Sequence, residues 1–329
     1  MDTNIQSLFL ETVRSRVPPN ISFADDLSEV LRISRDSAYR RIRGETVLTL
    51  DEVKLLCNHY HISLDALLAP TSNTVTFHHR LIGHDNFTFD HWLRSILDNL
   101  DTLQSFNQRE LIYQAKDLPI FQYFNYTELA AFKIFFWNKS VLTHDYLDEK
   151  FRPEIVQKER LSVARRIYDR YSMLPSTEIW CEETANITLR QIEFHYECGF
   201  FEDMRMVATI LDQFTEMLRI VRSWAATGSK GEGGPKYNLY RNDILIPDTA
   251  VLFSADDKRV AYITVNTMDL LTTSNEVFCA QFEKYLHNLL KRAVLISTTG
   301  EKERTKFFNY MESKVMSLRQ RLTPTHYVP

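Results

Sequence analysis

The sequence is poor in the residues that cross-link small secreted proteins. Its four cysteines are scattered and form no C-x-x-C pair: Cys57, Cys181, Cys198 and Cys279. Closely spaced cysteine pairs are typical of zinc sites, disulfide frameworks and redox motifs. We therefore expect four reduced thiols in a cytoplasmic protein, with no metal site and no disulfide.

Long apolar runs are missing as well. No stretch approaches the ~20 consecutive apolar residues that a membrane helix needs. The N-terminus, MDTNIQSLFLETVRSR, carries an acidic residue and no apolar run of the signal-peptide type. Hydrophobic residues make up 44% of the 329 residues and charged residues 25%, which are ordinary values for a soluble protein. We expect a cytoplasmic chain of two or three domains with no membrane partner.

An overall excess of positive charge is also absent, because the formal net charge is −4. This balance excludes a generally basic nucleic-acid coat. The arginines are nevertheless concentrated: five lie between Arg32 and Arg43, where the only acid is Asp36, and the rest of residues 1–70 is acidic. A local basic stripe on a near-neutral domain is typical of a specific, salt-sensitive DNA-binding surface.

Glycine is scarce, and its distribution suggests where the domains end. Half of the eight glycines lie in the octet Gly228–Pro235, which is typical of a linker. A polar stretch at 71–86 predicts a second linker. The expected organisation is therefore residues 1–70, a linker at 71–86, residues 87–227, a linker at 228–235 and residues 236–329.

Residues 1–70 have the apolar periodicity and the capping residues of five short helices. The first helix is predicted at Gln6–Arg14. Candidate N-cap residues precede the four later ones: Ser22, Ser34, Thr49 (with Glu52 three residues on, as in a capping box) and Ser63. Gly44 is expected to end the third helix.

The two remaining segments have different patterns. Residues 87–227 carry apolar stripes at helical spacing, the longest running from Val207 to Val221. After residue 236, three stretches rich in Val, Ile, Tyr and Leu predict strands, and two helices follow. The strands are expected at Tyr237–Ile246, Ala250–Ser254 and Arg259–Asn266, the last two as a hairpin, and the helices at Asn275–Arg292 and Glu301–Leu322.

The segment from Leu27 to Gly44 resembles the helix-turn-helix of the lambda-repressor-like (Xre-type) family of bacterial transcription regulators. The matching residues are Leu27 and Ser28 on the first helix, Leu31, Ile33 and Ser34 in the turn, Ala38 on the second helix and the terminating Gly44. Residues 49–68 resemble the last two helices of that family. Two positions depart from its pattern: Arg32 stands at the usual turn glycine, and Arg41 stands where an apolar contact is common.

The physical basis of such a motif gives the candidate site. A major groove admits one helix, which the preceding helix must brace. With Ala38 and Ile42 facing inward, we expect Arg35 and Arg40 to bond guanine edges, Ser37 to reach a base or phosphate, and Tyr39 and Arg43 to hold phosphates. The predicted DNA-binding residues are Ser34, Arg35, Asp36, Ser37, Tyr39, Arg40 and Arg43.

Together these features predict a mainly α protein: an N-terminal five-helix lambda-repressor-like DNA-binding domain, a helical middle domain and a small C-terminal α+β module. The expected function is that of a one-component, sequence-specific transcription regulator. It would bind double-stranded DNA as a homodimer at half-sites about 34 Å apart, and its long C-terminal part would dimerise and sense a small-molecule or peptide effector. We expect no enzyme activity and no cofactor.

Three alternatives stay open. A peptide-sensing regulator would use a helical-repeat groove, although no ~34-residue period is visible. An enzyme with an added DNA-binding domain would need converging acid, base or metal groups. A phage or toxin–antitoxin repressor could use the same DNA-binding module.

Three weaker patterns in the sequence have ordinary structural explanations. His78, His79, His84 and His91 are expected to be solvated linker residues. Glu193, His195 and Cys198 have no accompanying oxyanion motif and are expected to be ordinary helix positions. The aromatic stretch from Tyr113 to Trp137 is explained by core packing, with an apolar ligand pocket or dimer face as the other options.

Overall fold

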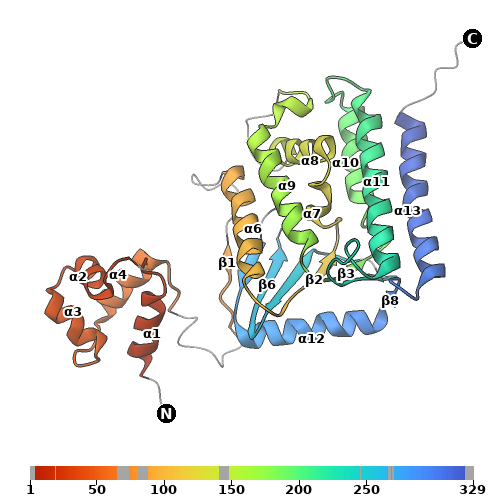
Figure 1. The fold of residues 1–329 in the computed structure, drawn as a ribbon. Coiled ribbons are helices and arrows are strands. Elements are labelled where there is room, and N and C mark those ends of the chain that lie inside the picture. Colours follow the sequence, from red (N-terminus) through yellow and green to blue (C-terminus); the bar gives the residue numbers. More distant parts are fainter. Residues whose placement is uncertain are drawn as a thin grey trace, which may run out of the picture. The chain divides into compact units, whose positions relative to one another are not determined.

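The structure is a computed structural model that describes residues 4–18, 20–64, 74–79, 88–140, 148–244, 246–265, 268 and 270–322. The chain divides into two compact units, Met1–Thr76 and Phe77–Pro329. The described residues contain twelve α-helices and one eight-stranded sheet (Figure 1). The expected fold class, mainly α with a small α+β module, is therefore wrong: the protein is mixed α/β.

The N-terminal unit contains four described helices: α1 (Ile5–Arg14), α2 (Phe23–Leu31), α3 (Arg35–Ile42) and α4 (Leu50–Tyr60). Their apolar faces meet in one core, formed by Phe9, Leu10, Val13, Leu27, Leu31, Ala38, Leu56 and Ile62. The predicted caps at Ser34 and Thr49 are confirmed, whereas the Ser22 side chain makes no capping hydrogen bond. The fifth helix, expected after Ser63, lies outside the described residues.

The second unit is built on one sheet with the strand order β1-β7-β6-β5-β2-β3-β4-β8. The central strands β2, β3 and β4 are parallel, and the other neighbouring strands pair antiparallel. The strands are β1 (His78–His79), β2 (Arg109–Ala115), β3 (Ser176–Trp180), β4 (Tyr237–Arg241), β5 (Ala250–Ala255), β6 (Lys258–Thr264), β7 (Leu270–Thr273) and β8 (Val294–Leu295).

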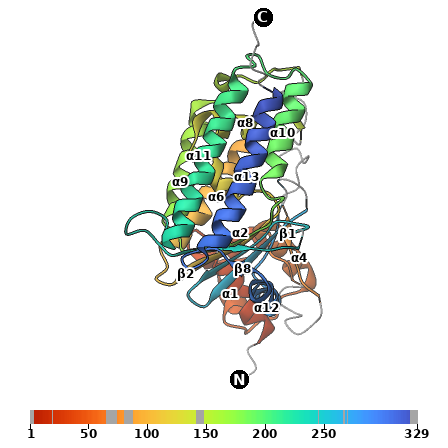
Figure 2. The ribbon, with the colours of Figure 1, turned by 90° about the vertical axis from the view of Figure 1, so that its right-hand side faces the viewer.

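Helices cover both faces of this sheet unequally. Helix α12 (Glu276–Arg292) lies across one face, and the other helices of the unit gather on the opposite face (Figures 1 and 2). These are α6 (Phe89–Gln104), α7 (Ile120–Tyr123), α8 (Thr127–Ser140), α9 (Lys158–Ser172), α10 (Asn186–Glu197), α11 (Met206–Thr227) and α13 (Glu301–Leu322). Along β2, Leu111 and Tyr113 enter the large helical core, while Ile112 enters the smaller core under α12, as strand alternation requires.

Strands β2 and β3 lie inside residues 87–227, which were expected to be helical throughout. They pair with β4 and β5 from the expected α+β module, so both segments share one sheet. The octet Gly228–Pro235 connects α11 to β4 within that unit, and Ser229 forms a bridge with Lys236. A helical-repeat groove is built from stacked helix pairs, whereas residues 87–227 contain β2 and β3 as well as helices.

The C-terminal elements follow the sequence patterns more closely. Strands β5 and β6 form the predicted hairpin, and α12 and α13 match the two predicted final helices. Strand β4 ends at Arg241, earlier than the Ile246 expected from the pattern. Among the residues described, no helix is both long enough and apolar enough to cross a bilayer.

Candidate nucleic-acid interface

Helix α3 is well defined at both ends. The Ser34 hydroxyl accepts a hydrogen bond from the Ser37 backbone N–H at 3.2 Å, which caps the helix N-terminus. At the other end, Gly44 has φ +73°, a left-handed conformation that glycine adopts without strain. Within this fully described helix, Ala38 is the buried residue, and Ile42 packs half-buried against the core. The exposed side chains of the helix form an outer face.

The turn between α2 and α3 keeps a left-handed residue where the Xre-type pattern has glycine. Arg32 occupies this position with φ 55° and ψ 44°. The Ile33 N–H donates to the Ser28 carbonyl at 3.0 Å and closes the end of α2. The arginine therefore preserves the turn, but a left-handed residue with a Cβ costs about 1 kcal/mol.

Arg41 is the second departure from the family pattern, and it forms an internal brace. Its Nε and Nη2 atoms donate to Glu52 Oε1 at 3.0 and 2.7 Å. Both side chains are only about 15% exposed. Burial alone would raise the pKa of Glu52, but the hydrogen bonds and the positive charge of Arg41 hold that pKa below its usual value. This pair fixes α3 to the start of α4.

Gln6 on α1 makes a second brace that the sequence did not reveal. Its Nε2 atom donates to the backbone carbonyls of Arg41 and Thr46 at 3.0 and 2.9 Å. Its Oε1 atom accepts from the Leu48 N–H at 2.9 Å. One amide thus holds the end of α3 and the loop that follows. Nothing in the sequence marks Gln6 for this role, because the helix carries several other polar residues.

The predicted DNA-binding residues lie together on α3 and its caps. Six have exposed side chains, namely Ser34, Arg35, Asp36, Tyr39, Arg40 and Arg43, and Ser37 is half-buried. The 100° step of an α-helix places Asp36, Tyr39, Arg40 and Arg43 on the side opposite Ala38, with Ser37 at its border. Arg35 lies only about 60° from Ala38 around the helix axis, but its side chain is exposed at the N-terminal end of the helix.

Acidic neighbours partly neutralise this arginine surface. Arg35 Nε lies 2.8 Å from an Asp25 carboxylate oxygen. Arg43 Nε lies 2.8 Å from Glu45, and Arg40 Nε lies 3.7 Å from the same carboxylate. All these side chains are about half exposed, and exposed ion pairs contribute at most about 1 kcal/mol. A phosphate could therefore replace either carboxylate at small cost.

The other residues singled out in the sequence do not form a site. Glu193 bonds Arg321, His195 is buried among phenylalanines and Cys198 is exposed. In the part of the chain that the structure describes, no group of three or more His, Cys, Asp or Glu residues could hold a metal ion. His78 and His79 are exposed in β1, and His84 lies outside the described residues.

No family model, no curated protein and no solved structure matches this chain. The resemblance to Xre-type regulators therefore rests on residues 27–44 and 49–68 alone.

Proposed function

We propose that this protein is a sequence-specific DNA-binding regulator that places α3 in the major groove of a duplex. The observation that carries the proposal is the outer face of α3. A capped helix, packed inward through Ala38, presents Arg40 and Arg43 outward, with Arg35 at its N-terminus. A helix of this kind fits the major groove, where arginine can bond guanine O6 and N7 with two hydrogen bonds.

The surroundings of α3 support this role because they fix its position. Recognition needs a helix held rigidly, since a small displacement removes bidentate hydrogen bonds. Helix α2 shares a core with α3, and the Arg41–Glu52 pair and the Gln6 side chain hold the helix in place. The helix N-terminus behind Ser34 also favours a phosphate. We assign base contacts to Arg35 and Arg40 and backbone contacts to Ser34, Tyr39 and Arg43.

The test begins with a duplex selected from a randomised library by the full-length protein. Binding of that duplex is then measured for Arg35→Ala and Arg40→Ala. Each bidentate contact contributes about 1–3 kcal/mol of discrimination, so each variant should bind about 5- to 150-fold more weakly and with a relaxed base preference at one position. Arg14→Ala on α1 removes the same charge from an exposed site and is the matched control.

Two results would contradict the proposal. One is failure of the library to yield any duplex that the folded protein prefers. The other is normal affinity and normal base preference in both α3 variants. A weakening shared equally by Arg14→Ala would indicate a general charge effect rather than recognition by α3.

A further inference from the structure

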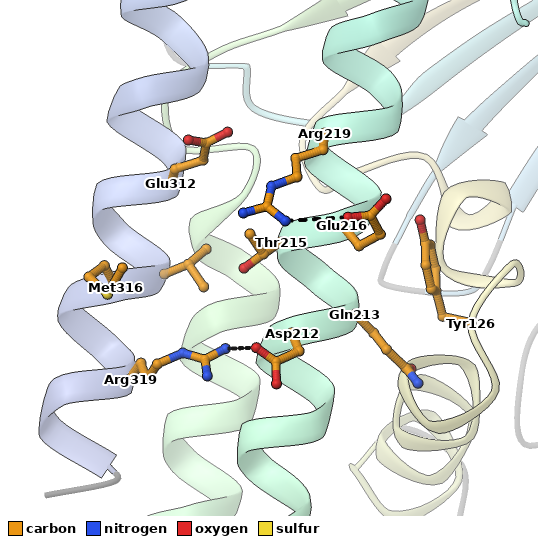
Figure 3. A pocket seen from close by; sticks show the side chains of 10 residues that line it. Tyr126, Asp212, Gln213, Thr215, Glu216, Arg219, Glu312, Met316 and Arg319 are labelled. Carbon is orange, nitrogen blue, oxygen red and sulfur yellow. Dashed lines mark hydrogen bonds and ion pairs between the residues drawn. The ribbon is translucent and has the colours of Figure 1, made fainter. Parts of the chain in front are cut away.

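Helices α11 and α13 lie side by side on the second unit (Figures 1 and 2). They are antiparallel: Arg319 near the end of α13 pairs with Asp212 near the start of α11, and Arg222 farther along α11 lies 3.6 Å from Glu312. An open furrow of about 630 Å³ lies along this part of α11, with Glu312, Val315, Met316 and Arg319 of α13 lining one side and Gln213 and Tyr126 lining the other (Figure 3). Thr215, Glu216, Arg219 and Met316 are among its lining residues.

The furrow is better suited to a protein surface than to a small molecule. Small-molecule sites usually enclose most of the ligand, whereas here the charged rim is open, with the Glu216 and Arg219 side chains 51% and 66% exposed. Its apolar lining includes Val315, which is buried, and Met316, which is 56% exposed and among the more exposed large apolar residues that the structure describes. An exposed apolar residue framed by charges is typical of a contact surface.

The charges along α11 indicate which surface would fit. Its outward side carries exposed acids in the first half, Asp212 and Glu216, and bases in the second half, the exposed Arg219 and the half-buried Arg222. When two such helices pack antiparallel around a two-fold axis between residues 217 and 218, each Glu216 lies opposite an Arg219 of the other chain. The pattern is thus complementary to itself, as an isologous interface requires.

The central charges are free to change partners. Within one chain Glu216 and Arg219 form an exposed pair at 3.5 Å, three residues apart on the helix (Figure 3). Such a pair contributes little. The outer charges Asp212 and Arg222 are already paired with α13. These ion pairs join α11 to α13 on both sides of the central charges.

We propose that a second copy of this chain docks on the α11–α13 furrow, with the two α11 helices antiparallel. The inference rests on the proposed function only for the biological role of the dimer, since a regulator that reads two half-sites needs two copies. The surface itself involves no residue of α3. Oligomeric state can therefore be measured without DNA, and the two proposals can fail separately.

The experiment measures the mass of the full-length protein by sedimentation and light scattering across the micromolar range. Wild type should be dimeric. Glu216→Arg places arginine opposite arginine, and Arg219→Glu places glutamate opposite glutamate, so each variant alone should dimerise on the order of 100-fold more weakly. Mixing the two variants in equal amounts restores two opposite-charge pairs, so the mixture should return to dimers. Lys284→Glu, on the opposite side of the sheet, is the charge-reversal control and should remain dimeric.

Three outcomes would overturn the inference. These are a monomeric wild type, single variants that remain dimeric, or a mixture that stays monomeric although circular dichroism shows both variants folded. Arg35→Ala should leave the mass unchanged, because a loss of DNA binding alone affects only the proposed function.

Discussion

Glu45 offers a direct way to increase DNA affinity if α3 is the binding surface. It follows Gly44 at the end of the helix and pairs with Arg43 at 2.8 Å and Arg40 at 3.7 Å. A duplex must displace this carboxylate before both arginines can contact the DNA. Glu45→Gln removes the competing charge and keeps the size of the side chain.

The size of the effect follows from exposure. The Glu45 side chain is 47% exposed, and the two arginines are 56% and 58% exposed. Pairs of this kind contribute about 0.2–1 kcal/mol each. Releasing two of them should strengthen binding by about 0.4–2 kcal/mol, which is about 2- to 30-fold. The free energy of unfolding of Glu45→Gln should fall by no more than the same small amount.

The assay is a fluorescence anisotropy titration of a selected duplex at several salt concentrations. Glu11→Gln on α1 makes the same change in net charge away from α3 and is the control. The reasoning fails if Glu45→Gln binds no more tightly than wild type. It also fails if Glu11→Gln gives an equal gain, because the effect would then come from net charge alone.

The helices around the candidate site could be predicted because their signals are local. Ser34, the Thr49–Glu52 capping box and Gly44 each act within four residues, and the structure confirms the helix limits that they predict. The exposed set on α3 also follows from spacing around Ala38. The braces could not be predicted, since Gln6 reaches residues 35 to 42 positions away and nothing in the local pattern indicates those partners.

Strands β2 and β3 were missed because buried and exposed positions do not alternate along them. Strand β3, Ser176–Trp180, is buried at every position, as expected for a parallel strand covered on both faces. It also contains Glu178, which a sequence pattern assigns to solvent. Tyr171, Trp180 and Tyr237 donate hydrogen bonds to its carboxylate. Burial raises the pKa of Glu178 despite these donors and the charge of Lys230.

The glycine-rich octet was misread for a related reason. Glycine is common both in flexible linkers and in tight turns, and composition does not distinguish them. Here Gly228 ends α11 with φ +72°. The Lys230 side chain then points inward. Its Nζ atom donates to the Tyr171 carbonyl at 2.9 Å and lies over the aromatic ring of Tyr171. A lysine buried in the core shows that the octet is part of the folded unit.

Two further predictions concern stability. Arg32→Gly should stabilise the N-terminal unit by about 0.5–1 kcal/mol in thermal unfolding because glycine relieves the left-handed strain. Arg32→Ala, which removes the same charge but keeps a Cβ, should give no gain, and equal gains would refute the strain argument. The second prediction concerns His195, which is fully buried and whose Nε2 atom has no hydrogen-bond partner among the described residues. Burial lowers its pKa to about 4 from 6.5, so the unfolded chain takes up the proton first as pH falls. The neutral, buried His195 therefore contributes in full to the free energy of unfolding above pH 6.5. That contribution is lost between pH 6.5 and pH 4, a change of about 3 kcal/mol. Denaturant titrations at pH 7 and 4.5 should show a smaller loss of stability in His195→Leu than in wild type, with exposed His287→Leu behaving as wild type. An identical loss in all three proteins would show that other groups control the acid sensitivity.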